Sequence, residues 1–175
     1  MTEYSRQEII DKIKLWLKEV QGVKVEHVTD KSIPPDYVVL KVSVKGEAPI
    51  ALLSHEQQLE RKIINIEYFI DIPNNSDLLR IMTPFRFDRS ANIGFKLLKL
   101  EDKVRFNNVM RVPILAGNLG YEWKPDLLNF DYLEISKIMY FDGFSKNSFF
   151  DALTGVIRGY EVCLAQYEEF TISAR

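Results

Sequence analysis

Residues able to carry out chemistry are few in this sequence. The 175-residue chain has two histidines, His27 and His55, and a single cysteine, Cys163. An ordinary metal site needs several His, Cys or carboxylate ligands that converge, and the two histidines fall near separate predicted strands. Cys163 lies within an apolar helical pattern, which favours a small buried hydrophobe over a nucleophile. The sequence therefore predicts no metal site, no cofactor and no catalytic residue of a recognised type.

Two arrangements of polar residues resemble fragments of active sites. Ser54 and His55 are adjacent, but neighbours on a strand point to opposite faces, so the imidazole cannot activate the hydroxyl. Glu67 and Asp71 share a strand face, about 13 Å apart by strand rise, which exceeds the separation of paired glycosidase carboxylates. We expect both carboxylates to face solvent. An enzyme would need a pocket in which neighbouring strands bring Glu67, Tyr68 and His55 together.

A basic segment with interleaved phenylalanines runs from Arg86 to Arg111. Basic groups and stacking aromatics together bind single-stranded nucleic acid. The candidate contacts are Arg86, Arg89, Lys96, Lys99, Lys103 and Arg105. Phenylalanines in a region of strand and helix are more often core, however, and a formal net charge of −2 gives no general attraction to phosphate. The sequence thus favours a solvated surface, and nucleic-acid binding is the weaker hypothesis.

The composition is that of a globular protein, with 46% hydrophobic and 27% charged residues. We expect one domain over residues 1–175, large enough to fold without disulfides or metals. The first twenty residues lack the apolar core of a secretory signal, and no uncharged stretch approaches the roughly 20 residues of a membrane helix. These features predict a cytoplasmic protein that does not bind membranes.

Hydrophobic spacing predicts the elements that position these residues. Ser5 and Glu8 form an S-x-x-E capping box ahead of a helix that stops near Gly22. Period-two alternation then predicts a strand from Val23, a strand over Tyr37–Lys45 with Pro49–Ser54 as its hairpin partner, and further strands over 62–73 and 78–87. Consecutive strands with short connections form an antiparallel meander.

Residues 88–120 fit both helical and alternating spacings. We favour a helix from Glu101, which Pro113 would kink or end, followed by a loop or a short strand over Tyr121–Leu128. A strand over Leu133–Phe141 then leads through a turn at Asp142-Gly143 into the last helix.

This last helix is predicted over Ser148–Phe170. Ser148 and Asp151 have the spacing of a capping box at its start. Eight residues recur at steps of three and four and predict one buried stripe: Phe149, Leu153, Val156, Ile157, Tyr160, Cys163, Leu164 and Tyr167. The fold class is therefore α+β, an antiparallel sheet flanked by an N-terminal helix and a long C-terminal helix.

The segment Leu133–Leu164 is similar to an uncharacterised archaeal family with a type III secretion chaperone-like fold. The runs that carry this resemblance are Ile135–Gly143 and Ser145–Leu153. The order of predicted elements agrees with that fold over most of the chain. The resemblance brings no catalytic residues, and it implies pairing of two copies, since members of that fold commonly form dimers.

Two classes of function remain open. Abundant apolar surface without recognisable chemistry favours a non-enzymatic module that binds a protein or a peptide, with a chaperone-like role as its finer form. The alternative is an enzyme with an unrecognised small-molecule pocket. We also predict a homodimer, because the strands are apolar on both faces in places and need a second covering layer; Val39, for example, opposes Val38 and Leu40. If the segment Ile93–Leu115 supplies that layer, a monomer suffices. The basic segment could also meet the acidic stretch Gly120–Phe170 across a subunit boundary.

Overall fold

The computed structural model describes residues 4–29, 33, 37–47, 63–74, 76–86 and 95–173. The chain forms two compact units. Unit 1 comprises residues 1–81 and 138–152, and unit 2 comprises residues 82–137 and 153–175. Compact units are not by themselves separate domains, so a single domain over residues 1–175 stays a prediction.

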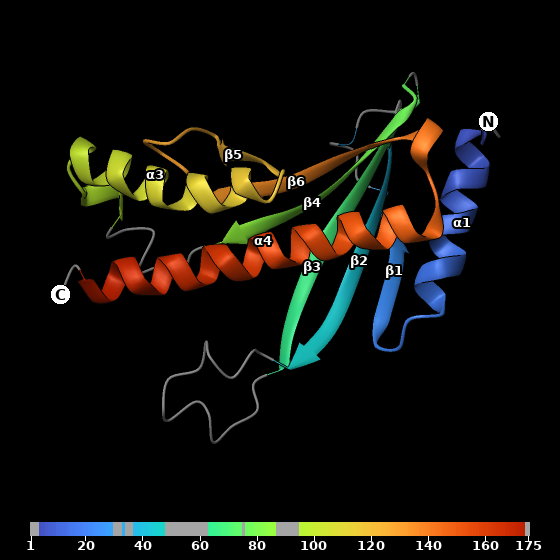
Figure 1. Cartoon of the computed structure of the whole chain (residues 1–175), viewed down its shortest axis with the longest axis horizontal. Helices are drawn as coiled ribbons and strands as arrows, with labels where there is room; N and C mark the ends of the chain where they lie inside the picture. Colours follow the sequence, from blue (N-terminus) through green and yellow to red (C-terminus); the bar gives the residue numbers. More distant parts are fainter. Residues whose placement is uncertain are drawn as a thin grey trace. The chain divides into compact units, whose positions relative to one another are not determined.

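The architecture is α+β with antiparallel strand pairing, as the sequence predicts (Figure 1). The strands form a six-stranded sheet in the order β1-β2-β3-β4-β6-β5. The elements in chain order are α1 (Arg6–Lys18), β1 (Val23–His27), β2 (Tyr37–Glu47), β3 (Ile63–Pro73), β4 (Leu78–Arg86), α3 (Leu100–Ala116), β5 (Gly120–Lys124), β6 (Tyr132–Tyr140), the 3-10 turn η3 (Phe141–Gly143) and α4 (Lys146–Ser173).

Strand β2 lies between β1 and β3. Its Val42 is opposite Val25 of β1 on one side and Tyr68 of β3 on the other. The strand predicted over Pro49–Ser54 lies outside the described residues, and β3 takes the place beside β2 that it was expected to fill. The long connection between β2 and β3 explains the error, because a hairpin with a tight turn was assumed after Gly46.

Helix α1 begins with the predicted capping box. The hydroxyl of Ser5 accepts a hydrogen bond from the Glu8 amide at 3.3 Å, and the Glu8 carboxylate accepts one from the Ser5 amide at 2.7 Å. These bonds to Ser5 hold the pKa of the Glu8 carboxyl below its usual value. Helix α1 ends at Lys18, and Gly22 supplies a left-handed residue, with φ of 79°, in the turn to β1.

Unit 1 has its core on one face of strands β2, β3 and β4. Alternation along these strands predicts this face, and the structure confirms it. Helix α1, which lies near β1 (Figure 1), contributes a buried stripe of its own. The buried side chains are Ile9, Ile10, Ile13 and Leu17 of α1, with Leu40, Val42, Tyr68, Ile70, Ile72, Leu79 and Ile81 of the strands.

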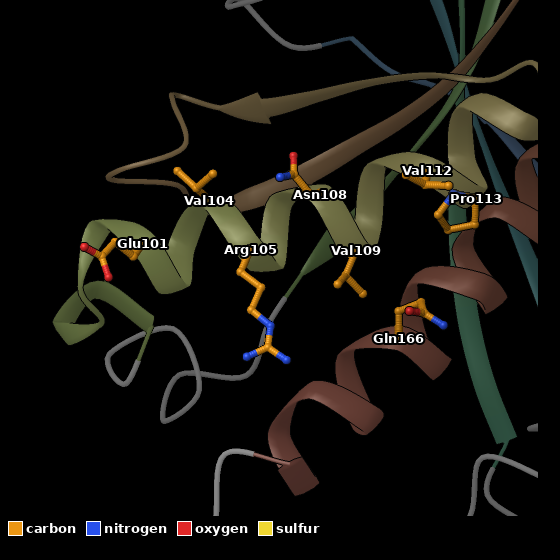
Figure 2. A pocket seen from close by; sticks show the side chains of 8 residues that line it. All are labelled: Glu101, Val104, Arg105, Asn108, Val109, Val112, Pro113 and Gln166. Atoms are coloured by element: carbon orange, nitrogen blue, oxygen red, sulfur yellow. The ribbon is translucent and has the colours of Figure 1, made fainter.

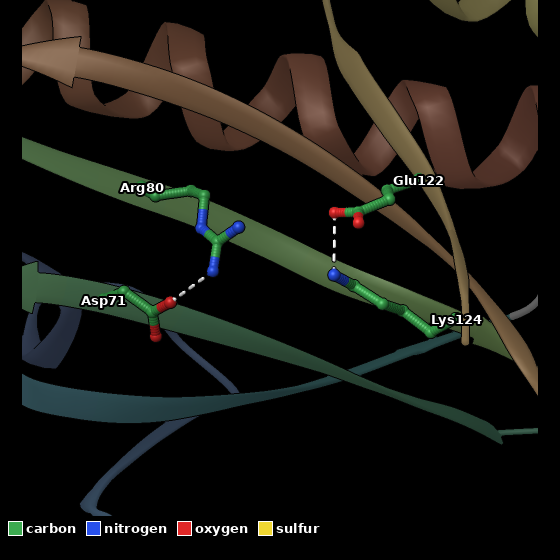
Figure 3. Close-up of polar contacts among 4 residues, drawn as sticks. All are labelled: Asp71, Arg80, Glu122 and Lys124. Carbon is green, nitrogen blue, oxygen red and sulfur yellow. Dashed lines mark hydrogen bonds and ion pairs between the residues drawn. The ribbon is translucent and has the colours of Figure 1, made fainter. Parts of the chain in front are cut away.

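The other face of strands β1 to β4 in unit 1 carries ion pairs. They are Lys24–Glu26 at 2.5 Å, Lys41–Glu67 at 2.5 Å and Arg80–Asp71 at 2.8 Å. Figure 3 shows the Arg80 guanidinium of β4 reaching the Asp71 carboxylate of β3. The prediction that Asp71 faces solvent is wrong: the residue is 6% exposed, and its charge is matched by Arg80. Glu67 is exposed, as expected.

Unit 2 places α3 beside β5 (Figure 1). The buried residues Phe106, Met110 and Ile114 follow one another at steps of four. The helix continues through Pro113 to Ala116, so of the two expected effects of the proline, a kink or an end, the end is excluded. A proline removes one amide donor, and the turn that follows is held by the Gly117 amide, which donates to the Pro113 carbonyl at 3.1 Å.

Helix α4 is continuous over 28 residues, as predicted, and begins earlier than expected. The residue that caps it is Ser145, whose hydroxyl accepts from the Ser148 amide at 3.1 Å, while the Ser148 hydroxyl accepts from the Ser145 amide at 2.9 Å. Ser148 is therefore the returning member of a capping box made of two serines, and its predicted pairing with Asp151 is wrong.

The predicted stripe of α4 is confirmed as its inner face. Phe149, Leu153, Val156 and Cys163 are buried, and the other four members are half-buried. Among the described helices, none combines the length and the apolar character that crossing a membrane requires.

Candidate functional site

The predicted nucleic-acid contacts that the structure describes differ in their surroundings. Lys103 is 8% exposed, and its ammonium donates to the carbonyl oxygens of Lys96 at 3.1 Å and Leu128 at 3.4 Å. It also lies over the Phe95 ring, 6.0 Å from the centroid. Lys103 thus ties α3 to two backbone segments of unit 2 and is not available to a phosphate.

The other predicted contacts are divided among different local interactions. Lys96 lies 3.7 Å from the Asp131 carboxylate, and Arg86 lies over the Tyr132 ring at 5.7 Å. Lys99 and Arg105 are exposed on or next to α3. Arg89 lies outside the described residues. Of the five described positions, four are exposed and Lys103 is buried. Nucleic-acid binding through this segment therefore stays a hypothesis.

Phe95 and Phe106 of the basic segment belong to the core of unit 2. Phe95, Phe106, Trp123 and Phe130 form a cluster in which all four rings are buried. Phe95 and Phe130 have centroids 4.6 Å apart in an edge-to-face arrangement, and Trp123 and Phe130 are 4.5 Å apart. Buried rings cannot stack on bases, which supports the core interpretation of these aromatics.

Asn107 completes this cluster, and sequence reasoning missed it. Its Oδ1 accepts from the Trp123 indole N–H at 2.8 Å and from the Tyr121 hydroxyl at 3.2 Å. Two donors from β5 therefore meet one acceptor from α3, which fixes the strand against the helix. A single polar residue on a helix gives no signal of this role until its partners are known.

Strand β3 does not place Glu67 and Tyr68 together, as the enzyme hypothesis requires. Tyr68 is 1% exposed and Glu67 is exposed, so these neighbours point to opposite faces of the strand. His55, the third member, lies outside the described residues. Within the part of the chain that the structure describes, no three His, Cys, Asp or Glu side chains converge as metal ligands would.

A groove of about 680 Å³ lies on the outer side of α3 in unit 2 (Figure 2). Its lining comes from α3, with Gln166 of α4 on the far side. In Figure 2, Val109 points from α3 toward α4, and Arg105 extends on the same side of α3. The lining residues are Glu101, Val104, Arg105, Asn108, Val109, Val112, Pro113 and Gln166.

The outer side of α3 carries several exposed apolar side chains. Val112 is 68% exposed, and the segment before α3 adds Leu97 at 82%. The full set of exposed large apolar residues is Leu97, Leu100, Val104, Val112 and Leu115, called here the α3 face. Because α3 has apolar residues on its inner side as well, periodicity could not reveal this face.

Two cations accompany the α3 face. Arg105 and Arg111 are both exposed, and neither forms an ion pair with another described residue. Glu101, also exposed, lies in the first turn of α3. An acid near a helix N-terminus complements the helix dipole, so Glu101 has a local role. The two arginines have no such role and remain open to a partner's charge.

A second cavity, of about 510 Å³, lies in unit 1 at the start of α1. We call it the α1 pocket. Three segments far apart in sequence line it: Tyr4, Ser5 and Arg6 before and within α1, Asn74, Ser76 and Asp77 between β3 and β4, and Tyr140, Phe141 and Asp142 at η3. The Phe141 amide donates to the Asp77 carbonyl at 2.9 Å and joins two of these segments. The sequence did not predict that these three segments meet, because polar residues in turns follow no regular pattern.

Comparison with known proteins places the chain among uncharacterised relatives. No curated protein matches it. The crystal structure of an uncharacterized protein from Methanothermobacter thermautotrophicus is similar in fold, with a TM-score of 0.65 at 18% sequence identity, over 93% of this chain and 99% of that one. A family described as uncharacterized conserved protein (DUF2299) matches residues 9–166. Since that match spans most of the sequence, the chain belongs to the DUF2299 family.

Proposed function

We propose that this protein is a non-enzymatic binding module, and that the α3 face holds an amphipathic helix of a partner protein. The observation that carries the proposal is the row of exposed apolar side chains on α3, led by Val112 at 68% exposure, next to a groove of about 680 Å³. Contiguous exposed apolar surface on a folded protein commonly marks an interaction site. Helix-in-groove recognition uses apolar anchors at helical spacing, which such a row accommodates.

The charges beside this row indicate which charged side chains the partner carries. Arg105 and Arg111 are exposed cations without an ion pair among the described residues. An apolar stripe flanked by Asp or Glu would bury its anchors on α3 and place its acids near these guanidinium groups. Complementary charges fix orientation and raise the association rate, while the apolar contacts supply most of the affinity. The occupant is therefore an acidic amphipathic helix.

A chaperone-like role is the finer form of this proposal. A chaperone holds an apolar segment of its client, which the α3 face suits in size and character. The resemblance of Leu133–Leu164 to a family with a type III secretion chaperone-like fold supports this form. The fold similarity to an archaeal protein adds no partner, because that protein is itself uncharacterized.

The direct test uses two synthetic peptides and fluorescence anisotropy. Both peptides carry leucines at helical spacing; one has flanking glutamates and the other has flanking lysines. We expect saturable binding of the glutamate peptide and at least several-fold weaker binding of the lysine peptide. Val112→Glu should weaken the glutamate peptide about tenfold or more, since it places a like charge among apolar anchors. Leu15→Glu, at a residue 58% exposed on α1, is the matched control and should leave binding unchanged.

A charge reversal separates this occupant from others. Arg105→Glu should reduce the preference for the glutamate peptide and raise binding of the lysine peptide. Equal binding of both peptides by the unmodified chain would contradict the proposed acidic partner. Self-association that Val112→Glu abolishes, without peptide binding, would show instead that a second copy of the chain occupies the α3 face.

A further inference from the structure

We propose that the α1 pocket in unit 1 binds a small zwitterion, a molecule with a carboxylate and an ammonium group such as an amino acid or a short peptide. This site is separate from the α3 face and does not depend on its function. Its volume of about 510 Å³ falls within the usual range of small-molecule sites, roughly 300–1,000 Å³.

The carboxylate side of the pocket is formed by Arg6 and Ser76. The Arg6 guanidinium donates through Nη2 to the Ile72 carbonyl at 2.8 Å, which holds the side chain in place. Its Nε–H is buried and has no hydrogen-bond partner among the described residues, and the same is true of the Ser76 hydroxyl. Buried donors without acceptors are rare in folded proteins, and two in one pocket indicate a missing acceptor.

A planar carboxylate suits these donors. A guanidinium presents paired N–H groups in a geometry that matches the two oxygens of a carboxylate. Both unpaired atoms are shielded from water in the free chain, so the side chains of Arg6 and Ser76 must shift for a ligand in the pocket to reach them. The Nε–H signal of Arg6 is therefore a sensitive reporter of occupancy.

The ammonium side is formed by Asp77 and Asp142. Both are exposed, and neither forms an ion pair with another described residue. The backbone bond from the Phe141 amide to the Asp77 carbonyl, at 2.9 Å, keeps the segments that carry the two acids together. Two carboxylates beside one guanidinium would repel a simple anion, whereas a simple cation would leave Arg6 and Ser76 unpaired. A zwitterion satisfies both sets of groups.

Aromatic rings complete the pocket wall. Tyr140 is 63% exposed and offers an uncovered ring beside the acids. Tyr4 is held by an edge contact with Phe144 at 6.3 Å, and the Lys12 ammonium lies 4.6 Å from its ring centroid. Tyr4 thus offers the ligand a fixed ring and Tyr140 an adjustable one. We therefore expect compact zwitterions with apolar substituents to bind more tightly than glycine.

Nuclear magnetic resonance of the full isotope-labelled chain tests the site. The probes are glycylglycine as the zwitterion, with acetate and methylammonium as its two halves. We expect glycylglycine to shift the Arg6 Nε–H signal and the backbone amides of Asp77 and Asp142 saturably. Each half should bind about tenfold more weakly or worse, because one set of charge-assisted hydrogen bonds is lost.

Variants distinguish a built site from general charge effects. Arg6→Lys keeps the charge but removes Nε, and Asp142→Asn removes one acid. Each variant should bind glycylglycine about tenfold more weakly, as measured from the shift of the Asp77 amide signal. Arg158→Lys and Asp151→Asn, at exposed positions of α4, are matched controls and should leave it unchanged. If Arg6→Lys disturbs the fold, Asp142→Asn on its exposed turn still decides. The proposal would be overturned if acetate bound as tightly as glycylglycine, or if no probe gave a saturable shift.

Discussion

Burial makes the Cys163 thiol a poor nucleophile. The residue is 1% exposed, and burial raises the pKa of its thiol to about 12. Since the thiolate is the reactive form, alkylation by iodoacetamide at neutral pH should be slow in the folded chain and rapid in urea. Mass spectrometry of the alkylated protein measures both rates. Rapid labelling of the folded chain would contradict the buried placement.

The same group makes stability depend on alkaline pH. The pKa of the Cys163 thiol is higher in the folded chain than the ordinary value of 9.0. The unfolded chain therefore releases this proton first, and the stability present below pH 9 is lost as the pH rises toward about 12. A Cys163→Ala variant should lack this part of the alkaline dependence when urea midpoints are compared at several pH values.

Leu153 tests the inner stripe of α4. It is 6% exposed, and Leu153→Ala should lower the free energy of unfolding by about 2–5 kcal/mol through lost burial and a residual cavity. The neighbouring Thr154 is exposed, so Thr154→Ala is the control and should change it by less than about 0.5 kcal/mol. Urea denaturation measures both variants. Equal effects would place the stripe in contact with water.

Two glycines of α4 give an element-scale prediction with an internal control. A Cβ on Gly159 would lie 2.6 Å from the Leu119 Cδ1 atom and 3.1 Å from the Ile135 Cγ2 atom, whereas one on Gly155 would lie 3.8 Å from Leu119. Leu119 is itself only 5% exposed and has little room to move. Gly159 therefore allows the close approach of α4 to its neighbours in unit 2.

We expect opposite outcomes for the two alanine variants. Gly155→Ala should raise the free energy of unfolding by about 0.5–1 kcal/mol, because alanine is the better helix former and the site has space. Gly159→Ala should be about 1–3 kcal/mol less stable than Gly155→Ala, because the added methyl group overpacks the contact. Thermal unfolding of both variants measures the difference. Equal stabilities would show that the close contact relaxes without cost.

Periodicity predicted the helices and strands whose apolar residues lie on one side. The stripe of α4 from Phe149 and the alternation around Ile70 are examples, since one buried face leaves a regular signal in sequence. The start of α4 was misplaced because Ser145 and Ser148 share the same chemistry, and only the backbone geometry shows which one caps the helix. The pairing of β2 with β3 depends on a long connection that local turn signals do not specify.

The candidate sites were beyond the reach of sequence patterns. The α3 face arises because Val112 and Leu115 face outward while Met110 and Ile114 are buried, so apolar residues surround the helix and no single stripe stands out. Arg6 and Ser76 are separated by seventy positions and become related only through the fold. Lys103 and Asp71 illustrate the converse, since each is a charged residue whose burial depends on partners that the sequence does not indicate.

At the scale of the whole molecule, association remains the main prediction. A homodimer was expected because both strand faces contain apolar residues, but the second face in unit 1 carries ion pairs such as Arg80–Asp71. The need for a second covering layer is therefore weaker there, and the homodimer stays a prediction without an assigned interface. Light scattering coupled to size exclusion should give about twice the 20.4 kDa chain mass. A mass of one chain at high micromolar concentration would contradict the dimer.

The two outermost strands, β1 and β5, are short and similarly charged. Each has five residues and bears one lysine and one glutamate two positions apart on the same side: Lys24–Glu26 at 2.5 Å and Glu122–Lys124 at 2.7 Å (Figure 3). Strand edges expose unpaired backbone groups on which foreign chains can assemble into amyloid-like ribbons, and brief charged edges resist this. We therefore expect these edges to disfavour fibril growth from the sheet, even though the α3 face exposes apolar side chains.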